Sequence, residues 1–299
     1  MGWFRDENGG WKKFDSYPNQ LNLIPYFIDV EKDMFFAKVS QIEKCINKNT
    51  VAIMIPNLLG NIADWEKISY IGKNISGLDD DEVTQLLRKS TEIAKSAVVS
   101  NDKYKKVRVA ASIGPYGAAL GDGSEYRGNY QVTNEYLREF HARRIEVLAQ
   151  TKPDLFAVET IPSASEAMII QELLDQSEIP YWISFSCKDT KNISEGDSFA
   201  KAVSSLKSSN NLLAVGINCT NPNYVEDLLQ SVSDFKENQK IDLVVYPNLG
   251  KNWDANTKTW LGHSIDFNIK IPLWKDLGAT YIGGCCGVGP KELAQLKVE

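Results

Sequence analysis

Three cysteines in this 299-residue chain are placed where they could bind a metal together: Cys219, Cys285 and Cys286. Cys219 ends the apolar run LLAVGINC, and the adjacent pair ends a second run, TYIGGCC. Gly283 and Gly284, directly before the pair, permit unusual backbone angles and close approach. Three thiolates could share one Zn²⁺ at Zn–S distances of about 2.3 Å, which leaves the fourth tetrahedral position open. Open zinc sites are catalytic, so the pattern predicts a catalytic zinc centre.

The chemistry of such a centre follows from its ligands. A soft thiolate shell favours zinc over magnesium or calcium. A substrate thiol in the open position would have its pKa lowered from about 8.5 and become a thiolate at neutral pH, a good nucleophile toward an activated methyl group. The alternative is two unrelated buried cysteine sites. A disulfide between the adjacent cysteines would be strained, and Cys45 and Cys187 are interpreted as core filling.

The elements that must position these cysteines are visible as a repeating pattern. From about residue 107 onward, continuous apolar runs alternate with amphipathic segments of helical spacing, which is typical of a parallel sheet buried on both faces. The expected strands are 107–114, 155–161, 181–187, 212–220, 241–248 and 280–286, and the expected helices are 136–150, 164–176, 198–208, 224–235, 271–278 and 290–298.

The first hundred residues supply two further units. Strands are expected at 23–30 and 50–56, with helices at 35–49 and 80–100. Six units plus two predict an α/β protein of the (β/α)8, TIM-barrel type, with atypical first two strand–helix units. The alternative is a smaller doubly wound domain behind a separate N-terminal piece.

Polar residues follow the same strands. In a parallel barrel, active-site residues lie at the carboxyl ends of the strands. Ser112, Glu159, Tyr246 and Asn248 all fall there, as do the three cysteines. They are therefore candidates for substrate binding, although Glu159 could instead be a structural partner of an arginine.

The amino-acid composition limits the classes of binding partner that we expect. Lys plus Arg total 33 and Asp plus Glu total 39, a net charge of -6. This balance, without a clustered cationic face, argues against nucleic acid. No stretch reaches the roughly 20 apolar residues of a membrane helix, and the N-terminus lacks the apolar run of a signal peptide. We therefore expect a cytoplasmic protein that binds neither nucleic acid nor membrane.

Residues 76–299 resemble the homocysteine S-methyltransferase family. The resemblance rests on SIGPYGAALGDGSEYRGNY (112–130), FAVETIPSASEA (156–167), GINCTNP (216–222), LVVYPNLGKNWD (243–254) and YIGGCCGVGP (281–290). It implies a (β/α)8 barrel in which Cys219, Cys285 and Cys286 bind Zn²⁺, and transfer of a methyl group to homocysteine to give methionine. The form of the first stretch most resembles the branch that uses S-methylmethionine or S-adenosylmethionine as donor.

The resemblance also implies roles at the mouth of the barrel. Glu159 matches a family acid that contacts the amino group of homocysteine. Asn218 and the turn that contains Tyr246 and Asn248 line the same mouth. A sulfonium donor leaves as a neutral thioether and needs no general acid, so catalysis would consist of thiolate activation and alignment of the two sulfurs.

The N-terminal segment, residues 1–75, departs from the family. The family's opening strand with its DGG-type turn, which helps to bind homocysteine, is missing. Residues 22–74 instead resemble a fragment of the PLP-dependent sugar aminotransferases, through PYFIDV, TVAIM and LGN. That fragment alone cannot form a PLP site. The chain thus resembles a fusion, and the alternative function is a catalytically impaired zinc-binding homologue that lacks part of the homocysteine pocket.

Overall fold

The computed structural model describes residues 3–5, 11–13, 80–99, 107–120, 122–250, 252–254, 259–262 and 264–289. The chain divides into two compact units: Met1–Asp81 with Asp254–Thr259, and Glu82–Trp253 with Trp260–Glu299. The expected strands at 23–30 and 50–56, and the expected helices at 35–49 and 290–298, lie outside the described residues. The boundary at about residue 75, between an atypical N-terminal segment and the methyltransferase barrel, stays a prediction.

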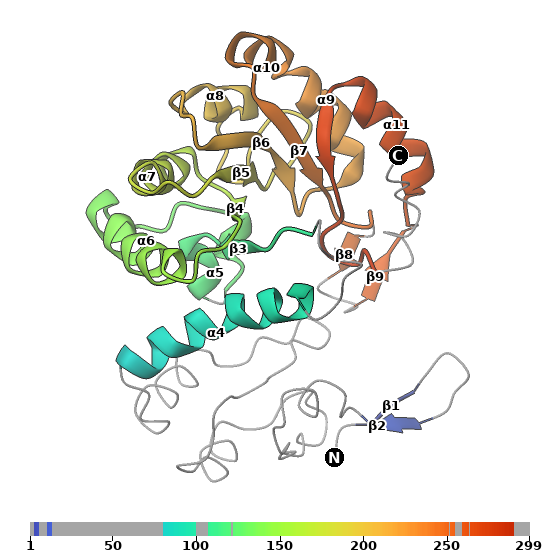
Figure 1. Cartoon of the computed structure of the whole chain (residues 1–299). Coiled ribbons are helices and arrows are strands. Elements are labelled where there is room, and N and C mark those ends of the chain that lie inside the picture. The colour runs from blue at the N-terminus through green and yellow to red at the C-terminus, as the bar shows by residue number, and fades with distance from the viewer. Residues whose placement is uncertain are drawn as a thin grey trace. The chain divides into compact units, whose positions relative to one another are not determined.

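The second unit is built on a six-stranded parallel sheet with the order β10-β7-β6-β5-β4-β3 (Figure 1). Five neighbouring pairs follow one another in this order, as the repeated strand–helix pattern predicts for a barrel-type sheet. The mixed α/β class and the six strands are confirmed. The strands are β3 (Ala110–Ile113), β4 (Leu155–Ile161), β5 (Tyr181–Phe185), β6 (Leu212–Asn218), β7 (Asp242–Tyr246) and β10 (Ala279–Ile282).

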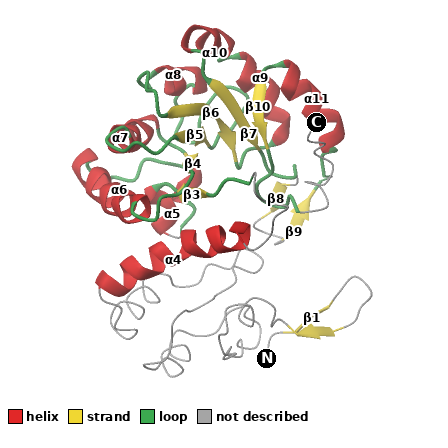
Figure 2. Ribbon diagram, viewed as in Figure 1, coloured by secondary structure: helices red, strands yellow, loops and turns green. Residues whose placement is uncertain are grey.

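Helices lie along the outer side of this sheet, one after nearly every strand (Figures 1 and 2). Side-chain caps start several of them: Thr133 accepts from the backbone N–H of Tyr136, and Ser163 from that of Glu166, which satisfies otherwise unpaired donors. The helices are α4 (Asp80–Val99), α5 (Tyr116–Leu120), α6 (Asn134–Ala149), α7 (Ala164–Leu174), α8 (Phe199–Ser204), α9 (Val225–Gln230), α10 (Ser233–Gln239) and α11 (Phe267–Asp276), with 3-10 turns η3 (Ser124–Tyr126) and η4 (Pro222–Tyr224).

Three of the expected helices differ in detail. The helix expected over 198–208 ends early, at Ser204. The helix expected over 224–235 is interrupted at Val232, whose backbone (φ -117°, ψ 11°) is not helical, so that α9 and α10 are separate. The helix expected over 271–278 begins earlier, at Phe267, because the side chain of Asp266 accepts from the N–H of Asn268 and caps it there. None of these changes moves a candidate site residue.

The core lies on both faces of the central strands. Val215, Ile217, Leu243 and Val245 are fully buried, as the continuous apolar runs predicted. Gly216 lets β6 and β7 approach, since a Cβ there would lie 1.8 Å from the backbone oxygen of Val244. These are the strands that carry Cys219 and Tyr246, so this close approach sets the spacing of the site above them.

The two outer strands, β3 and β10, are the most exposed of the sheet. In a closed barrel they would flank the strands of the first two units, which lie outside the described residues, so closure of the barrel stays a prediction. Two short two-stranded sheets complete the description: β1 (Trp3–Arg5) pairs antiparallel with β2 (Trp11–Lys13), and β8 (Asn252–Asp254) pairs with β9 (Thr259–Leu261). Among the described residues, no helix combines the length and apolar character needed to cross a membrane.

Candidate metal centre and active site

The structure brings the three predicted zinc ligands together. The Sγ atoms of Cys219, Cys285 and Cys286 all lie within 4.8 Å of one another, although 66 residues separate the first two in sequence. Cys219 and Cys285 have their Cα atoms 5.5 Å apart, and their sulfurs are joined in a disulfide. Cys286 is an exposed free thiol with its Sγ 3.7 Å from that of Cys219. Residues far apart in the chain thus form one sulfur cluster.

Cys219 is held by an unusual backbone conformation. It directly follows β6 and has φ 47°, in the left-handed region that side-chain-bearing residues seldom adopt. Its N–H donates to the carbonyl oxygen of Tyr246 at 3.3 Å, which ties the turn to the end of β7. Strain of this kind costs on the order of 1–3 kcal/mol and concentrates at functional sites. Here it turns the sulfur toward the end of β10.

The paired cysteines are held by the end of β7. The N–H of Cys285 donates to the carbonyl oxygen of Pro247 at 2.8 Å, and the N–H of Cys286 donates to Oδ1 of Asn248 at 3.2 Å. The backbone therefore keeps following β7 beyond the last residue of β10. Asn248, predicted as a substrate residue, acts in this structure on the backbone of a cysteine.

These donors fit a metal of the zinc type. In a tetrahedral thiolate site with Zn–S bonds of about 2.3 Å, neighbouring sulfurs are about 3.8 Å apart, and the Cys219–Cys286 separation is 3.7 Å. Reduction of the Cys219–Cys285 disulfide would supply the other two thiolates, and a soft sulfur set favours zinc over hard cations. Three ligands from the chain leave one position for another molecule.

Beside the sulfurs, polar side chains at the ends of β3, β4 and β7 are linked by hydrogen bonds. The Ser112 hydroxyl donates to Oε1 of Glu159 at 2.6 Å, and the Tyr246 hydroxyl also bonds the Glu159 carboxylate. Burial, and then the Glu159 charge, raise the pKa of Tyr246, so its hydroxyl stays protonated and can donate. Three of the predicted substrate residues are therefore adjacent: the Glu159 carboxylate lies between Ser112 and Tyr246 and interacts with both.

The network continues through the buried amide of Asn218. Its Oδ1 accepts from the N–H of Thr160 at 2.6 Å and from the Ser184 hydroxyl at 2.9 Å, and its Nδ2 donates to Oγ1 of Thr160 at 2.7 Å. Ser184 in turn bonds the Tyr246 hydroxyl at 2.6 Å. Thr160 has φ 62°, so Asn218 stabilises a strained residue next to Glu159. We call Ser112, Glu159, Thr160, Ser184, Asn218 and Tyr246 the strand-end network.

Sequence reasoning missed one part of the site, the 3-10 turn η3. The Tyr126 hydroxyl bonds the Cys286 sulfur, and burial together with the nearby Cys286 and Glu125 charges raises the pKa of Tyr126 to about 12. The Ser186 hydroxyl, just after β5, donates to the backbone oxygen of Glu125 at 3.3 Å. The stretch SEYRGNY was noticed as part of a resemblance, but nothing in its residue pattern predicts that it bends back over the strand ends.

A buried ionisable cluster supports this side of the site from behind. Glu166 is fully buried: its Oε1 accepts from the N–H of Tyr116 at 2.6 Å and contacts Nε2 of His141 at 2.9 Å, and its Oε2 accepts from the Tyr130 hydroxyl at 3.0 Å. Arg144 contacts Nδ1 of the same histidine at 2.9 Å. Desolvation lowers the pKa of His141. The cluster anchors both ends of the segment that contains α5 and η3.

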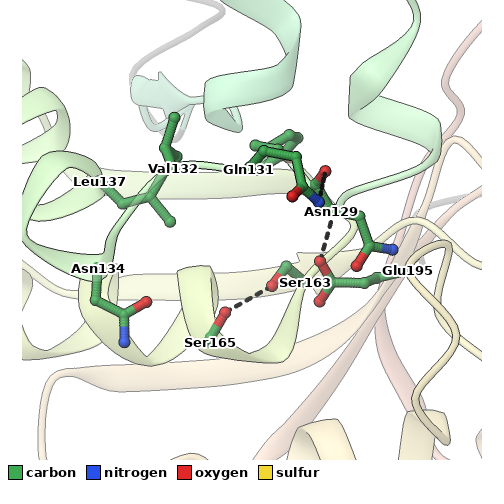
Figure 3. Close-up of a pocket in the computed structure, with 9 residues that line it drawn as sticks. Asn129, Gln131, Val132, Asn134, Leu137, Ser163, Ser165 and Glu195 are labelled. Carbon is green, nitrogen blue, oxygen red and sulfur yellow. Dashed lines mark hydrogen bonds between the residues drawn. The ribbon is translucent and has the colours of Figure 1, made fainter.

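A separate open pocket of about 230 Å³ lies outside the sulfur cluster (Figure 3). Polar side chains dominate its lining. Hydrogen bonds link several residues that line it: Oε1 of Glu195 accepts from the N–H of Asn129 at 2.7 Å, and the Ser163 and Ser165 hydroxyls are 2.9 Å apart. Neither the cysteines nor the residues of the strand-end network line this pocket.

A parallel, barrel-type α/β fold with three cysteine sulfurs gathered beside a carboxylate at its strand ends defines a class of candidate thiolate-metal enzymes. The sequence model described as Homocysteine S-methyltransferase matches residues 67–299. The protein belongs to this enzyme family. A second model, the DegT/DnrJ/EryC1/StrS aminotransferase family, matches residues 19–76. Both resemblances found in the sequence are therefore confirmed.

Individual relatives agree with this assignment. The chain is 42% identical over 234 residues to Homocysteine S-methyltransferase 1 of Arabidopsis thaliana, covering 73% of this chain and 71% of the relative. It is 38% identical over 238 residues to Homocysteine S-methyltransferase YbgG of Bacillus subtilis, covering 76% and 75%. The metallated form of the homocysteine methyltransferase MmuM from Escherichia coli superposes with a TM-score of 0.63 at 34% identity, covering 74% of this chain and 72% of that one. The same enzyme has also been solved in an oxidized form.

Proposed function

We propose that the protein transfers a methyl group from S-methylmethionine or S-adenosylmethionine to the thiol of homocysteine, giving methionine, with Zn²⁺ held by Cys219, Cys285 and Cys286. The observation that supports this most is the convergence of three sulfurs within 4.8 Å beside a carboxylate-centred network. Family membership supports homocysteine as the acceptor. The cytoplasmic location stays a prediction.

The reaction balances without a general acid. The homocysteine thiolate forms a new S–C bond to the methyl carbon, while the donor's S–CH3 bond breaks and its electron pair stays on sulfur as a neutral thioether. The thiol proton is released to solvent. A bound zinc ion supplies the lowered thiol pKa that makes the thiolate available at neutral pH.

The chain's own residues orient the acceptor. The Glu159 carboxylate would accept a hydrogen bond from the ammonium group of homocysteine. Ser112 and Tyr246 would hold that carboxylate in place by their hydrogen bonds. Asn218 is buried and its amide is occupied by Thr160 and Ser184. Its role in our proposal is to hold the Glu159–Thr160 segment, while Asn248 positions Cys286. Alignment of this kind lowers the barrier by fixing the reacting atoms in advance.

The second candidate is a zinc-binding homologue with impaired turnover. One observation favours it: residues 19–76, where the family's opening homocysteine motif is expected, match an aminotransferase family instead. Such a protein would keep the metal but bind homocysteine poorly.

Paired measurements on reduced protein separate the two candidates. We expect about one zinc per chain by mass spectrometry of the metal, and methionine formation from homocysteine with at least one of the two sulfonium donors. Zinc without methionine from either donor would support the impaired homologue. A fully reduced protein that binds no zinc would contradict both candidates.

A further inference from the structure

One carboxylate oxygen near the sulfur cluster has no partner. Oε2 of Glu125 is buried and makes no hydrogen bond with any described residue. A buried carboxylate oxygen without a partner has lost its hydration and gained no hydrogen bond in exchange, which is unfavourable. Such a group persists where another molecule supplies the missing partner, so the atom points to a ligand that carries positive charge.

The turn that carries Glu125 is fixed in place. Gly117 of α5 packs directly on it, because a Cβ at Gly117 would lie 2.6 Å from the backbone N of Glu125 and 2.6 Å from the backbone C of Ser124. Ser186 bonds the Glu125 backbone oxygen from the other side. The N–H of Gly128 also closes the turn by donating to the carbonyl oxygen of Ser124 at 2.9 Å. The carboxylate is therefore presented by a rigid support.

The same turn borders the reacting centre. Tyr126, the next residue, bonds the Cys286 sulfur, and the charges of Cys286 and Glu125 both act on its hydroxyl. Tyr126 as a whole is 45% exposed, and an aromatic ring beside a carboxylate can contribute to binding a cation. The turn contacts β4 but belongs to no strand, so it borders the site beside the strand-end network.

We propose that Glu125 is a substrate-binding residue that pairs with a cationic group of the sulfonium methyl donor. This rests on the proposed function, which requires two amino-acid-like substrates to bind side by side in one site. The carboxylate of Glu159 already has Ser112 and Tyr246 as partners within the strand-end network and is the group expected to meet homocysteine. The methyl donor then approaches the homocysteine thiolate from the side of η3, where Glu125 and the Tyr126 ring bind its positive charge.

The test measures donor binding directly, so that it does not depend on turnover. S-methylmethionine is titrated calorimetrically into reduced, zinc-loaded protein in the presence of homoserine, an unreactive analogue of homocysteine. We expect Glu125→Gln to weaken donor binding at least tenfold and to leave homocysteine binding unchanged. The matched control is Glu178→Gln, an exposed carboxylate remote in sequence, which should bind the donor like the wild type.

Thermal unfolding of the same variants shows whether a loss is merely structural. Because Glu125→Gln removes an unpaired charge, the substrate-free variant should melt no lower than the wild type. Donor binding that depends on Glu125 without any methionine formation would leave this inference standing and remove the proposed function. An unchanged donor affinity in Glu125→Gln, a loss confined to homocysteine, or a wild type that binds no donor would each overturn the inference.

Discussion

The strand-end network and the sulfur cluster are neighbours, yet they are completed in opposite ways. In the network, Asn218 and Ser184 are buried and each polar group finds its partner within the protein. In the cluster, Cys286 is an exposed free thiol, and its sulfur lies 3.7 Å from that of Cys219, which forms a disulfide with Cys285. Folding alone therefore satisfies the hydrogen bonds of the network, whereas the sulfur cluster needs a bound metal ion to complete it.

This difference separates stability from activity. A self-satisfied buried network contributes to the free energy of unfolding, since each removed partner leaves another group unpaired. Once its disulfide is reduced, the sulfur cluster contributes little to the free energy of unfolding until a ligand joins it. Substitutions in the two regions should therefore be distinguishable by which property they change, metal content or melting.

Removal of a sulfur should have the largest effect. In Cys219→Ala or Cys285→Ala, two ligands are too few for a tight open site, so we expect zinc to fall from about one per chain toward zero. Methionine formation should drop roughly a thousandfold or more, because the metal is worth several kcal/mol of barrier lowering. Metal analysis and initial rates provide the measurements, and chelation of wild-type zinc should mimic them with unchanged circular dichroism.

The matched control is the buried free thiol Cys187, whose pKa is raised by burial. Cys187→Ala should lose some core packing but keep its zinc and its rate. Equal zinc loss in Cys187→Ala and Cys219→Ala would mean that unfolding, and not coordination, removes the metal.

Breaking the network should reverse this pattern. Asn218→Ala leaves the Thr160 N–H and the Ser184 hydroxyl without their shared acceptor, so we expect a loss of about 2 kcal/mol in the free energy of unfolding, with zinc retained. Denaturant titration measures the first and metal analysis the second. Exposed Asn223→Ala is the control, expected within about 0.5 kcal/mol of the wild type. Zinc loss in Asn218→Ala at native pH would show that the two regions form one unit.

How much of this could be predicted from the sequence differs between the same regions. Apolar runs gave the six strands, and strand ends gave Ser112, Glu159, Tyr246 and the cysteines, because parallel strands place their carboxyl ends at one edge. The interactions across strands could not be predicted. From the sequence alone, Asn218 cannot be distinguished from a substrate-binding residue. In the structure its side-chain amide oxygen instead accepts a hydrogen bond from the N–H of Thr160, whose backbone is left-handed.

The turn η3 marks the other limit. Its position depends on long-range contacts, Gly117 packing on its backbone and Ser186 bonding Glu125 from beyond β5. Local residue preferences carry no information about such contacts. The disulfide between Cys219 and Cys285 was likewise not expected, since the sequence argument concerned only the adjacent pair.

A smaller effect should follow from displacing that turn. In Gly117→Ala the new methyl would meet the η3 backbone at 2.6 Å, so the turn must shift, at roughly 1 kcal/mol. We expect about a fivefold rise in the KM for the sulfonium donor, with zinc content and the KM for homocysteine unchanged. Gly114→Ala is the matched control, because nothing lies within 4 Å of a Cβ there. A rise in both KM values would place η3 in contact with both substrates.

The smallest effect concerns the pH dependence of stability through His141. Desolvation lowers its pKa in the folded protein, although Glu166 opposes the shift and Arg144 adds to it. A folded-state pKa below the unfolded value of about 6.5 means that the neutral ring stabilises the fold above that pH. This contribution is lost as the pH falls from about 6.5 toward the folded-state pKa.

Denaturant titrations of the wild type and His141→Gln between pH 8 and pH 5.5 measure the difference. We expect the wild type to lose stability more steeply below pH 6.5 than the variant, which has no proton to gain at this position. The variant should be less stable than the wild type at pH 8, since Glu166 and Arg144 lose a fitted partner. Parallel curves would show that the pKa of His141 is the same in the folded and the unfolded protein. A wild type that instead gains stability relative to the variant as the pH falls toward 6.5 would show that the ring is protonated in the fold, as an ion pair with Glu166.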